Sequence, residues 1–330
     1  MLDTIYIVRH GFRMNWHGNV TLGMLGRPRD PVLTAHGLDQ AAELATHFLS
    51  LPPESRPQLI ISSPYYRTVQ TSLPTSKALS LPIHLEPGLC EWFPRVEASR
   101  TDPEGTGGVH PYPPTRSLLE PYFPPNALAP TSAWPPVLYA DPEGEDVPQL
   151  HKRAVEVLRR IERQCELLFP DVKRVLLVSH AATIIAMGRA LVLKGPGAPW
   201  QEGADGAGYP VGAGTCSLSQ YDRHSSSSST SQHRIGNLDP TTAFTHTLNG
   251  SCDHLANGLE RDWNFGHLPY NVTERGMGND WDDDQAPSQA DLQKQVEHWE
   301  EQERLMAQHS SSSSQDIEST SETATGKTRL

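Results

Sequence analysis

The chain has 330 residues, with 39 acidic and 27 basic side chains and a formal net charge of −12. This length is enough for one or two domains with a sizeable core. The acidic balance argues against a surface that neutralises the phosphates of a nucleic-acid duplex, so we expect no direct nucleic-acid binding. The hydrophobic fraction of 36% is low and prolines number 29, which predicts that part of the chain is irregular.

Membrane and secreted classes do not fit this composition. The N-terminus shows neither a basic region nor a long apolar run, and no stretch approaches the length of a membrane span, so we expect no signal peptide and no membrane contact. The 4 cysteines lie far apart and form no CxxC pair. We therefore expect no disulfide framework, no zinc site and a reducing compartment, which is the cytoplasm, the nucleus or both.

Strand and helix signals alternate along most of the chain. Short β-branched or apolar runs predict strands at 4–8, 59–62, 82–86, 174–179, 217–221 and 241–248. Helical periodicity or helix-start signals predict helices from about 36 to 51, after Pro64, at 150–168 and at 184–193. This order predicts a three-layer α/β/α fold with a mostly parallel sheet, which binds ligands at the carboxyl ends of its strands.

Three segments interrupt this pattern. Between Pro94 and Pro148 lie 13 of the 29 prolines, which predicts a long loop or insertion at about 94–145 rather than a packed layer. The serine-rich segment 224–233 is typical of a flexible hairpin tip or linker. Residues 274–330 hold 13 acidic and 5 basic side chains and are interpreted as a mostly disordered tail, leaving 1–273 as the folded domain.

Chemically versatile residues follow four of the predicted strands. Two histidines, three arginines and one glutamate stand at these strand ends: Arg9, His10, Arg13, Arg67, Glu91 and His180. Because parallel strands end at one edge of a sheet, we expect them to converge in one crevice.

This set of side chains suits a phosphoryl group. Arginines without paired acids favour a bound anion, and their planar forks match phosphoryl oxygens. Nearby cations keep His10 neutral and nucleophilic, while His180 can donate to the oxygens on which charge develops. Glu91 can protonate the leaving group. The scheme requires neither a metal nor a cofactor.

These residues lie in four motifs that resemble those of a known family. Residues 7–11 (IVRHG) resemble the RHG signature of the histidine phosphatase superfamily, branch 1, which is phosphoglycerate mutase-like. Segments 62–71, 89–91 and 178–181 resemble that family's second-arginine, proton-donor and second-histidine motifs, in family order over residues 4–222. The resemblance implies that His10 is the nucleophile. It also implies that Arg9, Arg67, His180 and Arg13 bind the phosphoryl group, and that Glu91 is the proton donor.

The resemblance can be narrowed. Arg13 and residues 86–92 resemble the TULA/Sts phosphatases, and segments 4–16, 176–182 and 214–218 are most similar to the histidine-phosphatase domain of fungal transcription factor IIIC tau subunits. This implies a metal-independent phosphomonoester hydrolase acting on a small phosphorylated substrate or a phosphoprotein. The alternative is a transcription factor IIIC-like subunit that uses the domain as a scaffold within a protein assembly. A phosphoglycerate mutase ranks third, because residues 12–15 differ from the small polar pair of mutases.

Some roles stay open at this point. Arg13 could pair with a neighbouring acid instead of a phosphate, and Glu86 or an acid of the insertion could replace Glu91 as proton donor. Trp16, Trp92 and Phe93 lie beside the motifs, where they could form an apolar wall of the site or pack under the insertion.

Overall fold

The computed structural model describes residues 1–17, 25, 30–94, 113–141, 144–192, 209–224 and 244–265. The serine-rich segment from residue 225, the first part of the insertion (95–112) and the tail 274–330 lie outside these residues. Within the part of the chain that is described, no helix combines the length and the apolar character needed to cross a membrane.

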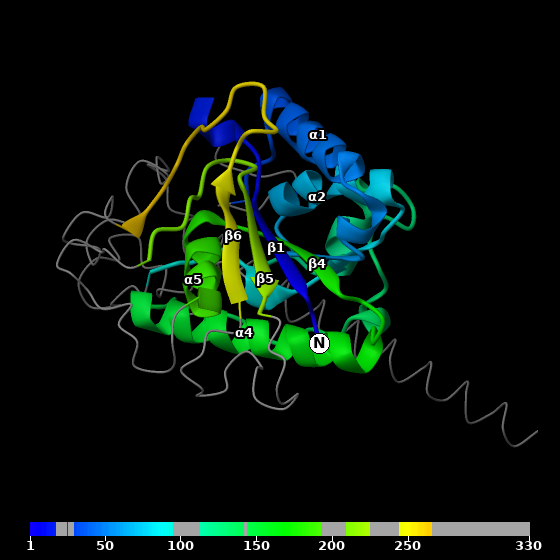
Figure 1. Ribbon diagram of the computed structural model, residues 1–330. Helices are drawn as coiled ribbons and strands as arrows, with labels where there is room; N and C mark the ends of the chain where they lie inside the picture. Colours follow the sequence, from blue (N-terminus) through cyan, green and yellow to red (C-terminus); the bar gives the residue numbers. More distant parts are fainter. Residues whose placement is uncertain are drawn as a thin grey trace, which may run out of the picture. The chain divides into compact units, whose positions relative to one another are not determined.

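One mixed sheet of six strands organises these residues, in the order β3-β2-β4-β1-β5-β6 (Figure 1). The strands are β1 (Thr4–Arg9), β2 (Leu59–Ser62), β3 (Ile83–Leu85), β4 (Arg174–Ser179), β5 (Leu218–Arg223) and β6 (Phe244–Ser251). The first four pair in parallel, whereas β5 runs antiparallel to β1 and β6 antiparallel to β5. The predicted mostly parallel α/β sheet is confirmed.

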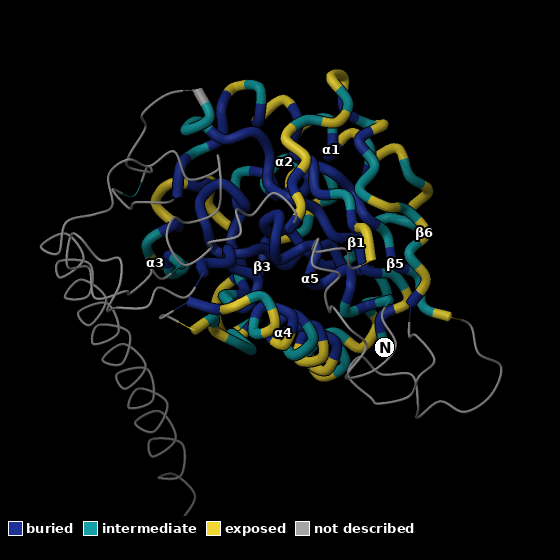
Figure 2. The backbone as a smooth tube through the Cα atoms, turned by 90° about the vertical axis from the view of Figure 1, so that its left-hand side faces the viewer, coloured by how far each residue is buried: buried dark blue, intermediate teal, exposed yellow. Residues whose placement is uncertain are grey.

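Helices cover both faces of this sheet. They are α1 (Ala35–Ser50), α2 (Tyr66–Leu79), α3 (Arg116–Leu119), α4 (Val147–Leu168) and α5 (Ala181–Val192), with 3-10 turns at Met14–His17, Pro53–Ser55, Pro87–Leu89, Glu120–Tyr122 and Thr131–Ala133. Side chains of α4 and α5 pack with Ile5 and Ile7 on one face, while those of α1 and α2 pack with Tyr6 and Val8 on the other. Because successive strand residues face opposite sides and both sides are covered, β1 is buried from Ile5 to Arg9 (Figure 2).

The described part of the insertion, 113–141, corrects one prediction. It is irregular, but it is packed: Ala127 accepts a backbone hydrogen bond from Ile83, and Ala129 donates one back to Ile83, so this segment extends the sheet beyond β3. Phe123 joins the core beside α2, and Trp134 is buried in the core beside α4. The segment holds only the short helix α3 and two 3-10 turns, as its proline content suggests, but that content carried no information about this burial.

Strand register places the site. Arg9 at the end of β1 pairs with Ser179 at the end of β4, and Ser62 at the end of β2 pairs with Val178. The three parallel strands therefore end at the same level. The residues that follow them must emerge together at one edge, as the sequence predicted.

Candidate active site

His10 is buried directly after β1, and its imidazole is oriented by its own loop. The Nδ1 atom lies 2.8 Å from the carbonyl oxygen of Gly11, which can only accept, so Nδ1 carries the proton and Nε2 holds a free lone pair. Burial, followed by the guanidiniums of Arg67, Arg9 and Arg13, lowers the pKa of this imidazole well below 6.5. The side chain is therefore a neutral base with Nε2 available to attack.

The residue after His10 must be a glycine for a steric reason. A Cβ atom on Gly11 would stand 2.7 Å from the carbonyl oxygen of Gly37 in α1. The Gly11 backbone amide also donates to the hydroxyl of Thr71, whose own proton is donated to the Arg67 carbonyl. The loop after β1 is therefore held between α1 and α2, with no room for a side chain at Gly11.

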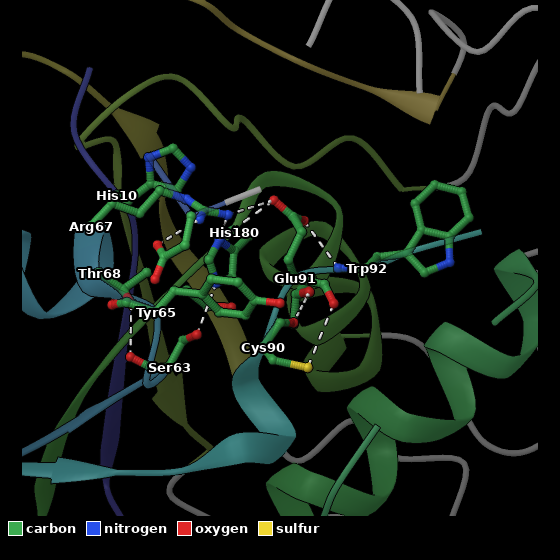
Figure 3. Close-up of polar contacts among 12 residues, drawn as sticks. His10, Ser63, Tyr65, Arg67, Thr68, Cys90, Glu91, Trp92 and His180 are labelled. Carbon is green, nitrogen blue, oxygen red and sulfur yellow. Dashed lines mark hydrogen bonds and ion pairs between the residues drawn. The ribbon is translucent and has the colours of Figure 1, made fainter. Parts of the chain in front are cut away.

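His180 follows β4 and lies beside His10, with ring centroids 5.5 Å apart (Figure 3). Its Nδ1 lies 3.0 Å from Nη2 of Arg67, and its Nε2 lies 2.8 Å from the hydroxyl of Ser63. Since a guanidinium only donates, Nδ1 accepts and Nε2–H donates to Ser63. Burial, then Arg67, lowers the pKa of His180 well below 6.5, so this ring is neutral as well.

Arg67, in the first turn of α2, is fully buried and links the site. Its Nη1 lies 3.1 Å from Oδ1 of Asp30, and its Nη2 lies 3.2 Å from Oε2 of Glu91. The expectation of arginines without paired acids is therefore wrong for this residue. The two carboxylates hold the guanidinium between the two histidines. Their charge-assisted contacts offset the entropy that this long side chain loses when it is ordered.

Arg9 and Arg13 are both buried near His10. Arg9 donates to the carbonyl oxygens of Ala213 and Arg261, which fixes its orientation. The Arg13 guanidinium lies 4.7 Å from the ring centroid of Trp16, a cation–π distance. Both cations lower the pKa of His10, so both lie within electrostatic reach of the nucleophile.

Glu91 lies at the edge of this cluster. Its Oε2 faces Arg67 and stands 3.5 Å from Nδ1 of His180, while Oε1 accepts from the backbone amide of Trp92. It is 8% exposed. This leaves the carboxylate beside both imidazoles, at a slightly open position where a leaving oxygen could approach it.

Glu86 was the alternative proton donor, and the structure uses it differently. Its carboxylate is completely buried and accepts four hydrogen bonds, from the amides of Gly88, Val137 and Leu138 and from the indole of Trp134. With its acceptor capacity occupied by the insertion, Glu86 anchors 134–138 and is not part of the crevice.

A second buried pair holds the segment that carries Glu91. The Nε atom of Arg153 in α4 contacts both carboxylate oxygens of Glu145, at 2.8 and 2.9 Å. Its Nη1 donates to the carbonyl oxygens of Gly88 and Cys90. These bonds fix the main chain on the N-terminal side of Glu91, so the insertion's C-terminal end and α4 together position the carboxylate.

The three aromatic residues beside the motifs have different surroundings. Trp92 is fully buried, donates its indole N–H to the Glu145 carbonyl, and points away from the cluster (Figure 3). Phe93 packs with Tyr65 and Cys90. Only Trp16, half-buried with its ring centroid 6.2 Å from that of His10, stands where an apolar wall was predicted.

A metal ion is the other occupant to consider. Ligand atoms of His10, Glu91 and His180 lie within 4.8 Å of one another, which is a possible ligand set. The same position is flanked by the guanidiniums that lower the pKa of both histidines. Burial is the larger cause of both low pKa values, and it disfavours a charge of either sign. The guanidinium charges add to it, and they disfavour a metal cation and favour an anion.

Sequence reasoning missed several neighbours of the site. Asp30 pairs with Arg67, Tyr65 packs its ring edge-on against His180, and Arg261 reaches Trp16 from the segment after β6. Tyr65 stands inside a quoted motif and could have been noticed. Asp30 and Arg261 carry no local signal, because only long-range packing brings them to the strand ends.

At one edge of the α/β sheet the structure therefore gathers two buried, neutral imidazoles, three buried arginines and one carboxylate. Residues 5–105 match the family model of the histidine phosphatase superfamily (branch 1).

The chain is also similar to individual proteins over most of its length. The transcription factor tau 55 kDa subunit of Saccharomyces cerevisiae is 32% identical over 278 residues, which cover 80% of this chain and 59% of that protein, so the chain spans about three fifths of its length. Among solved structures, the ecdysone phosphate phosphatase of Bombix mori has 17% identity and a TM-score of 0.48, covering 69% of this chain and 96% of the other. A mycobacterial glucosyl-3-phosphoglycerate phosphatase has 21% identity and a TM-score of 0.41, covering 67% and 92%.

Proposed function

We propose that this protein is a metal-independent phosphomonoester hydrolase that works through a phosphohistidine on His10. The observation that carries the proposal is the tautomer of this imidazole. Its proton is held on Nδ1 by Gly11, while burial and arginines keep Nε2 unprotonated. An imidazole prepared in this way, facing an arginine-lined crevice, is a nucleophile for an electrophile that carries negative charge.

The first step forms the bond between Nε2 of His10 and phosphorus and breaks the bond between phosphorus and the leaving oxygen. Protonated Glu91 gives its proton to that oxygen, so an alcohol or phenol leaves instead of its anion. Arg9, Arg13 and Arg67 offset the charge of the phosphoryl oxygens.

The second step returns the enzyme to its starting state. The Glu91 carboxylate takes a proton from a water molecule, whose oxygen attacks phosphorus as the bond to Nε2 breaks. Inorganic phosphate leaves, and Glu91 is again protonated. Each atom and proton is accounted for without a cofactor.

His180 fits two roles in this scheme. In the structure its Nδ1 accepts from Arg67, which holds that guanidinium in place. Donation to a phosphoryl oxygen requires the other tautomer, with the proton on Nδ1. The Ser63 hydroxyl permits this exchange, since it can donate to Nε2 as readily as it accepts.

Hydrolysis of a simple aryl phosphate with EDTA present tests the proposal. We expect turnover by the unaltered chain and a loss of about 10³-fold or more in His10→Ala, with the unfolding transition retained. Cys216→Ser, which changes a buried side chain behind the same loop, serves as a matched control. Absence of turnover by the unaltered protein over about pH 5 to 8 would contradict the proposal.

A scaffold role within a transcription factor IIIC-type assembly is the second candidate. The similarity to the yeast tau 55 kDa subunit, over 80% of this chain, favours it. The catalytic cluster does not exclude this role, because the proposed chemistry occupies only one edge of the sheet. Such a role would place the protein in the nucleus.

Affinity capture from a fungal nuclear extract separates the two roles. If His10→Ala recovers the same RNA polymerase III assembly factors as the unaltered chain, the scaffold role stands independently of catalysis. If neither protein recovers them, the scaffold role fails and the hydrolase proposal is unaffected.

A further inference from the structure

Arg261 brings a further cation to the mouth of the site from a remote part of the chain. It follows β6 in sequence, and its guanidinium lies 5.2 Å from the ring centroid of Trp16 and 5.5 Å from that of Phe12. The guanidiniums of Arg9 and Arg13 also lie near this ring, at 5.5 and 4.7 Å from its centroid. Trp16 is thus in contact with three arginines and adjoins His10.

The backbone of Arg261 is fixed at this place. Its carbonyl accepts the hydrogen bond from Arg9, and its φ of 49° is left-handed, a conformation that a non-glycine residue adopts only where its surroundings enforce it. On its two sides, the Glu260 carbonyl accepts from the Thr215 amide and the Asp262 carboxylate accepts from the Ala213 amide. The side chain therefore projects from a rigid support.

The surroundings of the Arg261 guanidinium differ from those of Arg67. The acids beside Arg67 are Asp30 and Glu91, both within 3.2 Å. Arg261 is exposed, and the described residues give its guanidinium only the two aromatic contacts. Its neighbours Glu260 and Asp262 are directed elsewhere, Glu260 towards His36 and Gln40 and Asp262 towards the Ala213 amide. Aromatic contacts orient the cation, and no carboxylate among the described residues forms an ion pair with it.

We propose that Arg261 is a specificity-determining residue that binds a second anionic group, a carboxylate or a second phosphate, on the part of the substrate that leaves. This inference rests on the proposed phosphatase activity and names its substrate class: phosphomonoesters that carry a further negative charge. Arg9, Arg13 and Arg67 act on His10 directly, whereas Arg261 reaches the site only across Trp16. Its fork is placed for the leaving group and not for the transferred phosphoryl group.

Paired substrates provide the test. We measure kcat/KM for phenyl phosphate and for phenyl phosphate with a carboxylate on the ring, using the full chain and Arg261→Gln. We expect the unaltered protein to prefer the carboxylated ester by about ten-fold, and Arg261→Gln to lose that preference while phenyl phosphate is hydrolysed as before. Arg159→Ala removes an exposed arginine that pairs with Glu156 on α4, and should keep the preference.

Each outcome has one reading. Equal hydrolysis of the two esters by the unaltered protein, or an equal loss on both in Arg261→Gln, overturns the role of Arg261 and leaves the hydrolase proposal standing. Failure of the unaltered protein to hydrolyse either ester overturns the hydrolase proposal, and the specificity role falls with it. Retention of the preference by Arg261→Lys, which keeps the charge but not the planar fork, further supports an electrostatic role.

Discussion

Two carboxylates five positions apart mark two regions of different character. Glu86 is completely buried and accepts four hydrogen bonds, three of them from the insertion. Glu91 is slightly exposed and faces a guanidinium and an imidazole. Both sit in one short segment between β3 and the insertion. Both residues are glutamates, so residue type does not tell them apart. The hydrogen-bond and ion-pair partners of their carboxylate oxygens do.

The comparison shows how the insertion serves the site without entering it. At one end, residues 134–138 close over Glu86, and at the other Glu145 pairs with Arg153 beside the Glu91 segment. In the cluster around Glu91, the charges of Arg67, Asp30 and Glu91 lie in direct contact beside two neutral imidazoles. Where the insertion packs on Glu86, the buried carboxylate and the N–H groups around it satisfy one another by hydrogen bonds, as a folded core requires. Catalysis and stability should therefore separate on mutation.

Glu91→Gln and Glu86→Gln should separate activity from stability most clearly. We expect Glu91→Gln to lower kcat for an aryl phosphate by about 10² to 10⁴-fold, because an amide cannot shuttle the proton. Glu86→Gln should leave kcat within about ten-fold but lower the free energy of unfolding by about 1–3 kcal/mol, since an amide nitrogen faces N–H donors. The loss should grow for esters with poorer leaving groups in Glu91→Gln alone. A matching loss of activity in Glu86→Gln would break the comparison.

Trp134→Ala tests the packed insertion. Removing this buried indole from the core should lower the free energy of unfolding by about 3–5 kcal/mol, measured by urea titration. Trp134→Phe keeps most of the packing but loses the bond to Glu86, so about 1–3 kcal/mol is expected. If Trp134→Ala unfolds at the same urea concentration as the unaltered chain, the insertion is not part of the core.

Acid should destabilise the fold through buried neutral histidines. Burial lowers the pKa of His84 to about 4, and His84 packs against Trp134 and Phe169. The unfolded chain binds a proton near pH 6.5, but the folded chain does not, so stability falls as pH drops from about 6.5 towards 4. In His84→Phe, urea unfolding measured across this range should show a smaller decrease. A slope as steep as that of the unaltered chain would assign the effect to other groups.

The sequence predicts the strand ends well. Residues 9–10, 67, 91 and 180 converge because parallel strands of similar length must end at one edge, a consequence of backbone geometry alone. Burial is the larger cause of the low pKa of His10, and the arginines that the sequence places beside it add to the effect. The predicted sheet is confirmed and these residues lie together, while their roles stay predictions.

The remaining features depend on distant packing. Asp30 accepts from the Tyr66 amide 36 positions away, and the Arg261 carbonyl accepts from Arg9 252 positions away, so no local periodicity predicts either contact. Proline content indicated an irregular insertion, but the burial of Trp134 depends on a complementary surface on α4 and β3. Three of the four hydrogen bonds to Glu86 likewise come from residues about fifty positions away.

The account depends most on covalent chemistry at His10. We would mix the protein with a radiolabelled aryl phosphate, quench within milliseconds in alkaline denaturant, and map the label by peptide mass. The account predicts an acid-labile, base-stable phosphoryl group on His10, absent from His10→Ala and longer-lived in Glu91→Gln. Steady turnover with no label on His10, or with the label on another residue, would contradict it.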